Sequence, residues 1–516
     1  MAKITAKNYA FPSQAVSDSV KKTQEYGLSV GRAIEQEWFN KDNNGVSRFY
    51  NSREECHRLR LYARGEQSIK KYKDEFAING DLSYLNLDWK PVPIVPKFVD
   101  IVVNGMQDRT FTIKAVGQDA LSTGKRTKFV NDVQQDLNTA DLLLKIEQQL
   151  GVSARNFAVN ELPANTEELE LYMQLNYKQG IELAEEQAIE NIFKSNGYDQ
   201  IKRRVDYDIA TIGIGCAKHG FNNTDGVVID YVDPANLVWS YTEDPNFEDC
   251  YYFGEVKNIK VNELKKEFPN LSNPEISELV KKGSNWNVYN TYNPQDYYTN
   301  DSLSQNNTLT VLYFNWKTWE HDVYKIKEIS TGAKKAIEKD DSFDPPEDNV
   351  RFEKVKQTRE VIYEGVLVLG TDQLLKWQKA TNMVRPNANI NKVMMNYVTS
   401  APRMYKGNIN SLVAKMTPYA DLIQLTHLKL QQAIQRMTPS GVYLDADGLA
   451  EIDLGNGNNY NPQEALNMYF QTGSIIGRSL NVEGDPNPGK IPITELPGSG
   501  GSQVQVLVGA YNQYIQ

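Results

Sequence analysis

The sequence predicts an α+β fold, because short strand-like runs are grouped between longer stretches of helical pattern. Apolar residues recur at helical spacing over 97–107, 198–212 and 407–437. Runs rich in Val, Ile and Tyr, bounded by turn residues, predict strands over 227–232, 309–316 and 361–369. With 516 residues the chain is long enough for about three domains and for a sizeable core.

The first part of the chain is predicted to be mainly helical. A helix is expected over about 17–39, and a proline-rich stretch over 91–96 breaks the chain before an apolar helix over 97–107. The stretch 161–197 has eight glutamates among apolar residues at helical spacing, which is typical of a helix with one solvated face. A helix over 198–212 ends at Gly213 and leads into a strand.

The middle of the chain changes to a strand pattern. The strand over 227–232 is closed by a turn over 233–236. Residues 284–307 are dense in Asn, Tyr and Ser without periodicity, which predicts a loop or linker. Beyond it, 308–385 is interpreted as a small α+β module inserted between two larger parts, because helical pattern dominates on both sides.

The last part returns to helices. The helix over 407–437 has apolar residues on more than one face, so it is expected to be buried on two sides, as in a bundle or a ring of neighbours. A hairpin is expected over 441–454 with its turn at 445–448. Residues 481–502 are rich in Gly and Pro, and a final helix is expected to begin near Gln503.

Composition limits the class of protein. The chain has 56 Lys and Arg against 66 Asp and Glu, a net charge of −10, which argues against a protein that grips nucleic acid through phosphate contacts. It does not argue against one that lets nucleic acid pass. Three scattered cysteines, Cys56, Cys216 and Cys250, exclude a disulfide framework. The sequence has no signal-peptide pattern and no apolar run long enough for a membrane helix.

No motif predicts catalysis. Ser122-Thr123-Gly124-Lys125 resembles a phosphate-binding loop, but the glycine spacing is wrong and Arg126 stands where a Ser or Thr hydroxyl is needed, so a surface loop is expected. The four histidines are scattered, without a metal-binding or nucleophile spacing. We therefore expect no catalytic, cofactor or metal site and no enzymatic activity.

One segment resembles a known family. Residues 228–268 place a strand, a Val-Asp-Pro turn, an aromatic strand and an acidic stretch before a further strand and helix, which resembles the portal proteins of tailed bacteriophages. Residues 94–106 look like that family's early helix, 309–316 with 361–369 like its clip, and 406–437 like its second stem helix. The resemblance is strongest to portals of crAss-like phages of gut Bacteroidales.

The resemblance implies a portal-like subunit with an α/β wing, a long helical stem and a small inserted α+β clip module. On that basis the wing comprises 1–256 and 438–516, and 257–299 is the first stem segment with a linker. The clip comprises 300–399 and the second stem helix 400–437. Residues 481–502 are the tunnel-loop candidate, and the final helix would lead to a crown.

The resemblance also implies a function. Members form dodecameric rings at one capsid vertex, through which double-stranded DNA is packaged and ejected. The implied partners are the major capsid protein, a tail adaptor or head-completion protein and the terminase large subunit, with no membrane. The implied location is the virion, with the host cytoplasm during assembly. The alternatives are a packaging-associated ATPase or nuclease, or a multidomain scaffold or binding protein.

Five residues are candidates for the wall of the DNA channel. Gln424, Gln431 and Gln435 are polar positions of the helix over 407–437 that could face a lumen, although ordinary solvent-exposed positions explain them equally well. Asn487 and Lys490 lie in the tunnel-loop candidate.

Overall fold

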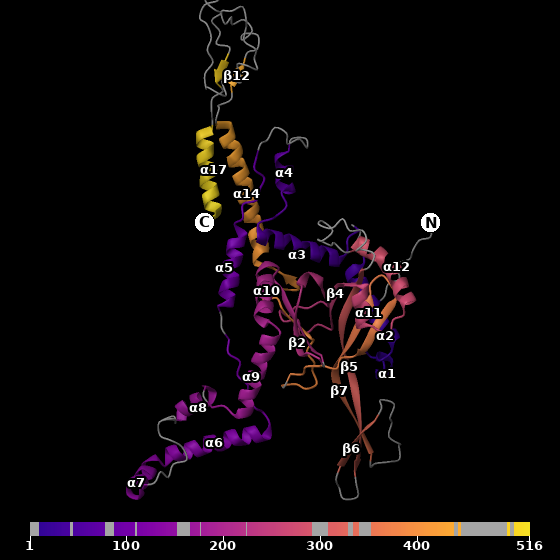
Figure 1. Ribbon diagram of the computed structural model, residues 1–516, viewed down its shortest axis with the longest axis vertical. Coiled ribbons are helices and arrows are strands. Elements are labelled where there is room, and N and C mark those ends of the chain that lie inside the picture. Colours follow the sequence, from indigo (N-terminus) through magenta and orange to yellow (C-terminus); the bar gives the residue numbers. More distant parts are fainter. Residues whose placement is uncertain are drawn as a thin grey trace, which may run out of the picture.

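The computed structural model describes most of the chain, and its elements belong to a body, a helical arm and a helical hairpin. The described residues are 10–41, 45–77, 87–108, 111–151, 166–175, 177–222, 224–290, 308–328, 334–339, 352–386, 388–437, 442–444, 493–495 and 500–515. The helical hairpin leaves one end of the body, and the arm lies toward the other end (Figure 1). Separate helices and antiparallel sheets confirm the α+β class.

The largest sheet is antiparallel and runs through the middle of the body. Its strands follow the order β3 (Leu237–Trp239), β4 (Tyr252–Lys260), β5 (Thr308–Glu328), β7 (Phe352–Val368) and β8 (Gln373–Lys379), with β6 (Lys334–Lys339) paired to the far end of β5. The register of β5 and β7 runs from Val311 opposite Val368 to Lys327 opposite Phe352. These two strands are the longest in the described chain and extend beyond the body as a hairpin (Figure 1).

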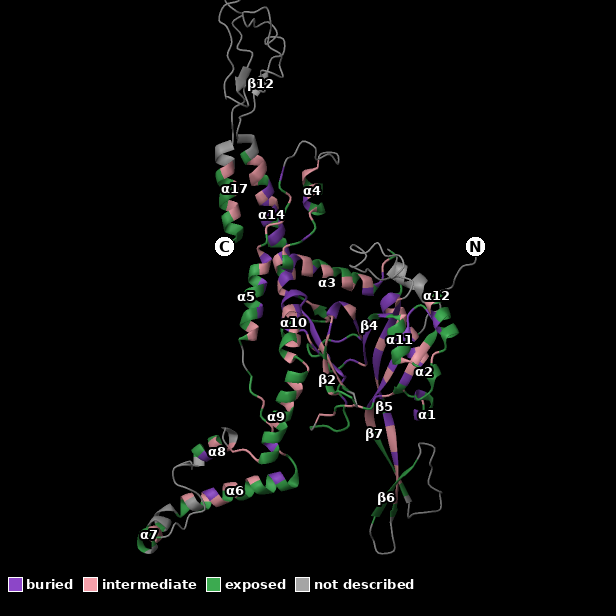
Figure 2. Cartoon of the chain, viewed as in Figure 1, coloured by how far each residue is buried: buried purple, intermediate pink, exposed green. Residues whose placement is uncertain are grey.

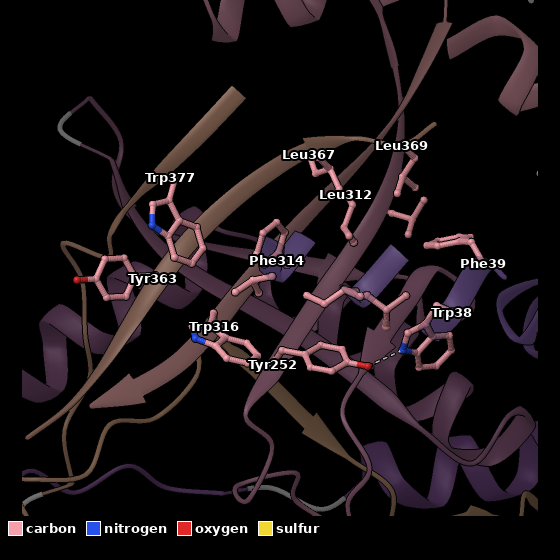
Figure 3. Close-up of a cluster of buried hydrophobic side chains, with 14 of the residues drawn as sticks. Trp38, Phe39, Tyr252, Leu312, Phe314, Trp316, Tyr363, Leu367, Leu369 and Trp377 are labelled. Atoms are coloured by element: carbon pink, nitrogen blue, oxygen red, sulfur yellow. Dashed lines mark hydrogen bonds between the residues drawn. The ribbon is translucent and has the colours of Figure 1, made fainter. Parts of the chain in front are cut away.

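The core of the body lies between this sheet and the N-terminal helices. After the short α1 (Asp18–Lys21), helix α2 (Gln24–Phe39) begins at Thr23, whose side chain accepts a hydrogen bond from the backbone N–H of Tyr26. The α2 side chains pack against aromatic residues of β4, β5, β7 and β8 (Figure 3). Trp38 is 1% exposed and donates its indole N–H to the Tyr252 hydroxyl at 2.9 Å. Each such buried side chain contributes about 2–3 kcal/mol.

A second, smaller sheet lies beside the first. Its order is β2 (Gly226–Val232), β1 (Gly215–Asn222) and β9 (Tyr397–Ser400). Helix α10 (Tyr198–Thr211) leads into β1 through Gly213, which has φ +94°. A side chain there would also meet the backbone of Asn410 at 3.1 Å, so glycine suits this helix end for two reasons. The predicted helix end and the following strand are confirmed.

A helical layer covers the second sheet. It comprises α3 (Arg48–Arg64), α5 (Val95–Gln107), α10 and α14 (Leu412–Met437). The short α4 (Lys70–Phe76) packs beside α14. Val99 of α5 and Val413 of α14 are fully buried in the shared core of this layer. Helix α5 has Pro96 in its first turn, where backbone N–H groups have no partner within the helix, so proline loses no hydrogen bond there. The opposite side of α5 is exposed (Figure 2).

The arm consists of α6 (Ala120–Asn138), α7 (Ala140–Leu150), α8 (Thr166–Leu175) and α9 (Gly180–Ser195). Phe129 of α6 packs against Tyr172 and Tyr177, with ring centroids 6.4 and 4.5 Å apart. Residues 122–125 lie inside α6, so the expected surface loop is wrong. Asp119 starts the helix by accepting the backbone N–H of Ser122, and those residues then follow the helical pattern.

The remaining elements flank the two ends of the body. Helices α11 (Val261–Glu267) and α12 (Asn273–Asn290) follow β4, and α12 packs against β5. The short pairs are β10 (Met404–Tyr405) with β11 (Asn408–Ile409), and β12 (Val442–Leu444) with β13 (Ile493–Glu495). Helix α17 (Gly500–Ile515) returns beside α14 (Figure 1).

Three expectations from the sequence need correction. Residues 308–385 do not form a module of their own, because β5 pairs with β4 from Tyr252–Trp316 to Lys260–Thr308 within one sheet. A hairpin was expected over 441–454, but its first strand, β12, pairs with the distant β13 instead. The expected turn at 445–448 lies outside the described residues. Residues 284–290 belong to α12 rather than to a loop, and 291–307 lie outside the described residues.

Candidate channel segment

The helical hairpin of α14 and α17 is the candidate channel segment, because it contains three of the five residues proposed for the channel wall. Helix α14 has 26 residues and contains Pro418, which is exposed and lies within its second turn. Helix α17 has 16 residues and no charged side chain. Val506 of α17 is 71% exposed and Ile515 is 41% exposed, so part of the apolar surface of this helix is left uncovered within one subunit.

An aspartate on α14 ties the hairpin to the body. Asp421 accepts hydrogen bonds from the hydroxyls of Tyr62 of α3 and Tyr72 of α4, both at 2.7 Å, and pairs with Lys71. Burial and the neighbouring Asp421 carboxylate raise the pKa of Tyr62 to about 12 and also raise the pKa of Tyr72. Both hydroxyls therefore stay protonated near neutral pH and remain donors.

Gln424 lies one turn further along α14 and is 1% exposed. Its Oε1 accepts the backbone N–H of Val92 at 2.8 Å, and its Nε2 donates to the Lys90 carbonyl at 3.3 Å. The amide thus satisfies two backbone groups of a proline-rich segment that has no helix or sheet partner of its own. The Gln424 amide is therefore occupied by contacts within its own subunit.

Gln431 has a comparable role closer to the end of the helix. Its Oε1 accepts the backbone N–H of Asp88 at 3.1 Å, and its Nε2 lies 2.9 Å from Nε2 of His427. The His427 ring lies 5.9 Å from the ring of Tyr511 on α17. Gln431 therefore links the body to the hairpin. The side chain of Gln435 and the residues Asn487 and Lys490 lie outside the described part of the chain.

An arginine between two aspartates holds the other end of the helical layer. Arg60 of α3 pairs with Asp208 of α10 at 3.0 Å and with Asp233 of the 233–236 turn at 2.7 Å. Burial raises the pKa of Asp208, whereas the bond to Arg60 outweighs burial at Asp233 and lowers its pKa. This contact could not be predicted from the sequence, because Arg60 is 148 residues from Asp208 and 173 residues from Asp233 along the chain.

No catalytic arrangement stands out among the described residues. The three cysteines are buried and unpaired, and burial raises the pKa of Cys56 and Cys216 to about 12, which keeps both as unreactive thiols. Within the described ranges, no group of three or more His, Cys, Asp and Glu side chains is placed to hold a metal ion. No helix in that part of the chain is long and apolar enough to cross a membrane.

Comparison with known families identifies the class of protein. A model of the Phage P22-like portal protein family matches residues 178–448, a little over half of the chain. The chain therefore belongs to the P22-like phage portal protein family. The match extends from before α9 to just beyond β12, and so includes both sheets and α14. A search of curated proteins found no match.

Family membership supplies the general role. Portal proteins are structural components of the phage capsid vertex that assemble into rings and associate with DNA. This role agrees with the expectation of a structural protein rather than an enzyme. The specific resemblance to portals of crAss-like phages stays a prediction, because the family match does not distinguish between groups of phages.

Proposed function

We propose that this chain is the subunit of a portal ring at one capsid vertex, through which double-stranded DNA is packaged and later ejected. The proposed ring also serves as a docking platform for the terminase large subunit and for a tail adaptor or head-completion protein. It contacts the major capsid protein, and it is assembled in the host cytoplasm. The observation that carries this proposal is the family match, whose residues include the α14 helix of the hairpin.

The surface of α17 supports assembly into a ring. Helix α17 has no charged residue, and its described side chains are all at least partly exposed. Burial of this apolar surface would contribute about 25 cal/mol of free energy per Å². Phe98, Ile101 and Val102 on the outer side of α5 are also exposed, by 41, 58 and 37%. Helices α17 and α5 lie along the same edge of the subunit (Figure 1). Neighbouring subunits in a closed ring would cover this edge.

The charge balance suits a conduit. Each phosphate that a protein neutralises adds salt-dependent affinity, which would slow a DNA that has to move. A net charge of −10 per subunit, repeated around a ring, instead repels the DNA backbone. Because α17 has no lysine or arginine, a lumen along this helix would offer no phosphate grip. A ring of twelve subunits remains the proposed stoichiometry.

The contacts favour a division of the chain that differs from the sequence-based one. We propose that α14 and α17 together form the stem, because they pack side by side, whereas α12 packs on β5 of the large sheet. The large sheet then belongs to the wing, since it shares its core with α2. Strands β12 and β13 pair with each other and lie beyond the ends of α14 and α17 in Figure 1, so we propose that the clip lies in the part of the chain between these two helices.

Electron microscopy of the purified protein tests the proposed function. We expect rings with an open central channel, and addition of linear double-stranded DNA at physiological salt should give no stable complex with the ring. Monodisperse monomers across the range of protein concentration and salt that supports capsid assembly would contradict the proposal. Rings that retain DNA tightly would contradict the conduit argument alone.

A further inference from the structure

We propose that the far end of the large sheet binds the phosphate backbone of double-stranded DNA through six lysines on one of its faces. This site, the lysine face, comprises Lys325, Lys327, Lys335, Lys339, Lys354 and Lys356. The inference rests on the proposed function in taking DNA as the partner, and it adds a DNA contact outside the candidate channel segment.

The lysine face lies on the three-stranded part of the large sheet that extends beyond the body (Figure 1). Here β5 is the central strand, with β7 on one side and β6 on the other. Residues directly opposite each other in antiparallel strands point to the same side of the sheet. Val323 of β5 lies opposite Lys339 of β6 and Lys356 of β7, so these three residues form the first row of the face.

Two further rows follow, because alternate residues of a strand share a side. Lys325 lies opposite Ile337 of β6 and Lys354 of β7. Lys327 lies opposite Lys335 of β6 in the last row. Six of the nine residues in the three rows are lysines, and none is acidic. All of β6 is exposed (Figure 2), and each of the six lysines is exposed or half-buried.

The opposite face of the same strands has a different charge. Its positions on β5 include Tyr324 and Ile326, and the positions opposite these two residues include Glu338 of β6 and Glu353 of β7. On β6 a single lysine, Lys334, belongs to this face. The strand register therefore sorts the lysines to one side of the sheet, instead of spreading them over both.

Protection of an open sheet edge explains only part of this arrangement. Lysines on an edge strand discourage pairing with another chain, which accounts for Lys335 on β6. Lys325 and Lys327 lie in the central strand, where β6 and β7 occupy both edges. Lys325 opposite Lys354 and Lys327 opposite Lys335 are like-charge pairs, which destabilise a sheet. An anionic partner on this face would offset that repulsion.

Double-stranded DNA fits the lysine face better than an acidic protein does. Lysine is depleted at protein–protein interfaces, whereas it commonly binds phosphate as a point charge. Three rows cover about 14 Å, along which each strand of a duplex has about four phosphates. None of the nine residues is Arg, Asn or Gln, the side chains that read bases, so the contact should not depend on sequence. Portal proteins associate with DNA, which makes a duplex available.

The contact should be weak at physiological salt, as a moving DNA requires. Six phosphate contacts lose about a thousandfold in affinity between about 50 and 200 mM salt. Lys325, Lys327, Lys354 and Lys356 also interact within the chain, and the sequence 340–351 between β6 and β7 contains five Asp and Glu, which lowers the affinity further. The lysine face lies at the end of the subunit away from α14 and α17, so it adds no phosphate contact along the proposed channel (Figure 1).

Fluorescence anisotropy of a labelled short duplex, titrated with the full-length protein over a range of salt from about 50 mM upward, tests the proposal. We expect binding at low salt, with a log affinity that falls linearly with log salt. Lys335→Gln should weaken binding at low salt about tenfold and reduce the salt slope by about 1. The matched control is Lys334→Gln, the adjacent exposed residue of the same strand on the opposite face, which should change neither quantity.

The double variant Lys327→Gln with Lys335→Gln should reduce the slope by about 2. Polyglutamate should displace DNA only at a much higher concentration of charge, because its charges are less densely spaced. The proposal is overturned if the protein does not bind DNA at low salt, or if Lys334→Gln and Lys335→Gln weaken binding equally. It is also overturned if polyglutamate binds as tightly as DNA, which would assign the face to an acidic protein.

The outcome is separable from that of the proposed function. Rings that form without binding DNA at low salt would reject the lysine face and leave the ring in place. DNA binding that depends on Lys335, in a protein that forms no rings, would reject the ring and leave the lysine face in place.

Discussion

Gln424 of α14 accepts the backbone N–H of Val92 at 2.8 Å, from a side chain that is 1% exposed. This bond joins the helical hairpin to the chain segment that precedes α5. Together with Asp421 and Gln431, it shows that the polar side of α14 faces the body of its own subunit. The polar positions along this helix therefore hold the hairpin at a fixed angle to the body, and the apolar surface of α17 faces outward.

We expect Gln424→Leu to lower the stability of the subunit. The change removes two hydrogen bonds, from the N–H of Val92 and to the carbonyl of Lys90, which together contribute about 1–3 kcal/mol. Thermal unfolding followed by circular dichroism measures the loss. The matched control is Gln513→Leu on the exposed side of α17, which should change stability by less than about 0.5 kcal/mol. Equal effects of the two variants would contradict the role given to Gln424.

Asp421→Ala should be more damaging than either tyrosine substitution. It removes one acceptor from Tyr62, Tyr72 and Lys71 together, so we expect a loss of about 2–4 kcal/mol. Tyr62→Phe leaves the bond from Tyr72 intact and should cost only about 1 kcal/mol. Denaturant unfolding of the two variants gives the comparison. A smaller loss for Asp421→Ala than for Tyr62→Phe would argue against a shared acceptor.

The contact between the starts of α6 and α9 in the arm, which is held by Glu182, should become less stable in acid. Burial alone would raise the pKa of Glu182. The N–H groups of Gln179 and Gly117 and the charge of Arg126 outweigh burial, so the pKa of Glu182 lies below its ordinary value of 4.5. Because the folded pKa is lowered, the carboxylate contributes stability above about pH 4.5, which is lost as the pH falls through the folded value. Hydrogen exchange of the N–H groups of Gly117 and Gln179 should therefore accelerate below pH 4.

The variant Glu182→Gln provides the control for this prediction. It keeps the shape of the side chain but removes the charge, so exchange at Gly117 and Gln179 should be fast at every pH and lose its acid dependence. Glu190→Gln, on the exposed side of α9, should behave as the unmodified protein. An acid transition that persists in Glu182→Gln would assign it to another group.

Two deletions distinguish the large sheet from the proposed clip. Removal of 308–385 deletes β5, β7 and β8, which supply Phe314, Trp316 and Tyr363 to the main core, so the subunit should not fold. Removal of 445–492, with β12 and β13 joined by a short linker, should leave rings that form but no longer dock the motor or the tail adaptor. Solubility, ring formation and a pull-down assay test both. A folded, ring-forming protein without 308–385 would restore the inserted-module interpretation.

Several helices and strands could be predicted from local periodicity and turn residues. Helix α10 and the strand after Gly213 were anticipated because a glycine at a helix end and the switch from helical to alternating pattern are local signals. The pairing of β4 with β5 could not be anticipated, because strand partners are chosen by tertiary packing and 47 or more residues separate the two strands. The large sheet therefore includes strands on both sides of the linker expected over 284–307.

The contacts of the candidate channel segment depend on tertiary packing, as the strand pairing does. Helical spacing pointed to the polar positions of α14, but it could not indicate that Gln424 bonds to another segment of its own subunit. That contact depends on the segment 87–92, whose backbone groups need partners and whose position is set by the packing of α4 and α5. The contact between Arg60 and Asp233 was invisible in the sequence, since ion pairs between distant residues leave no periodic signal.

The exposed apolar surface of α17 leads to a prediction for assembly. Val506 is 71% exposed, so Val506→Asp should change the stability of the isolated subunit by less than about 0.5 kcal/mol while it prevents ring formation. Ile337→Asp is the control, because Ile337 is 38% exposed on β6, away from α17. Size-exclusion chromatography with light scattering reports the change. Unaltered rings in Val506→Asp would remove α17 from the interface.

The most direct test of the account is single-particle electron microscopy of the purified, unmodified protein. The account predicts closed rings in which α14 and α17 of adjacent subunits pack around an open channel, with the large sheet farther from the axis. Monomers at every concentration, or rings in which α17 is exposed and the large sheet lines the channel, would contradict it.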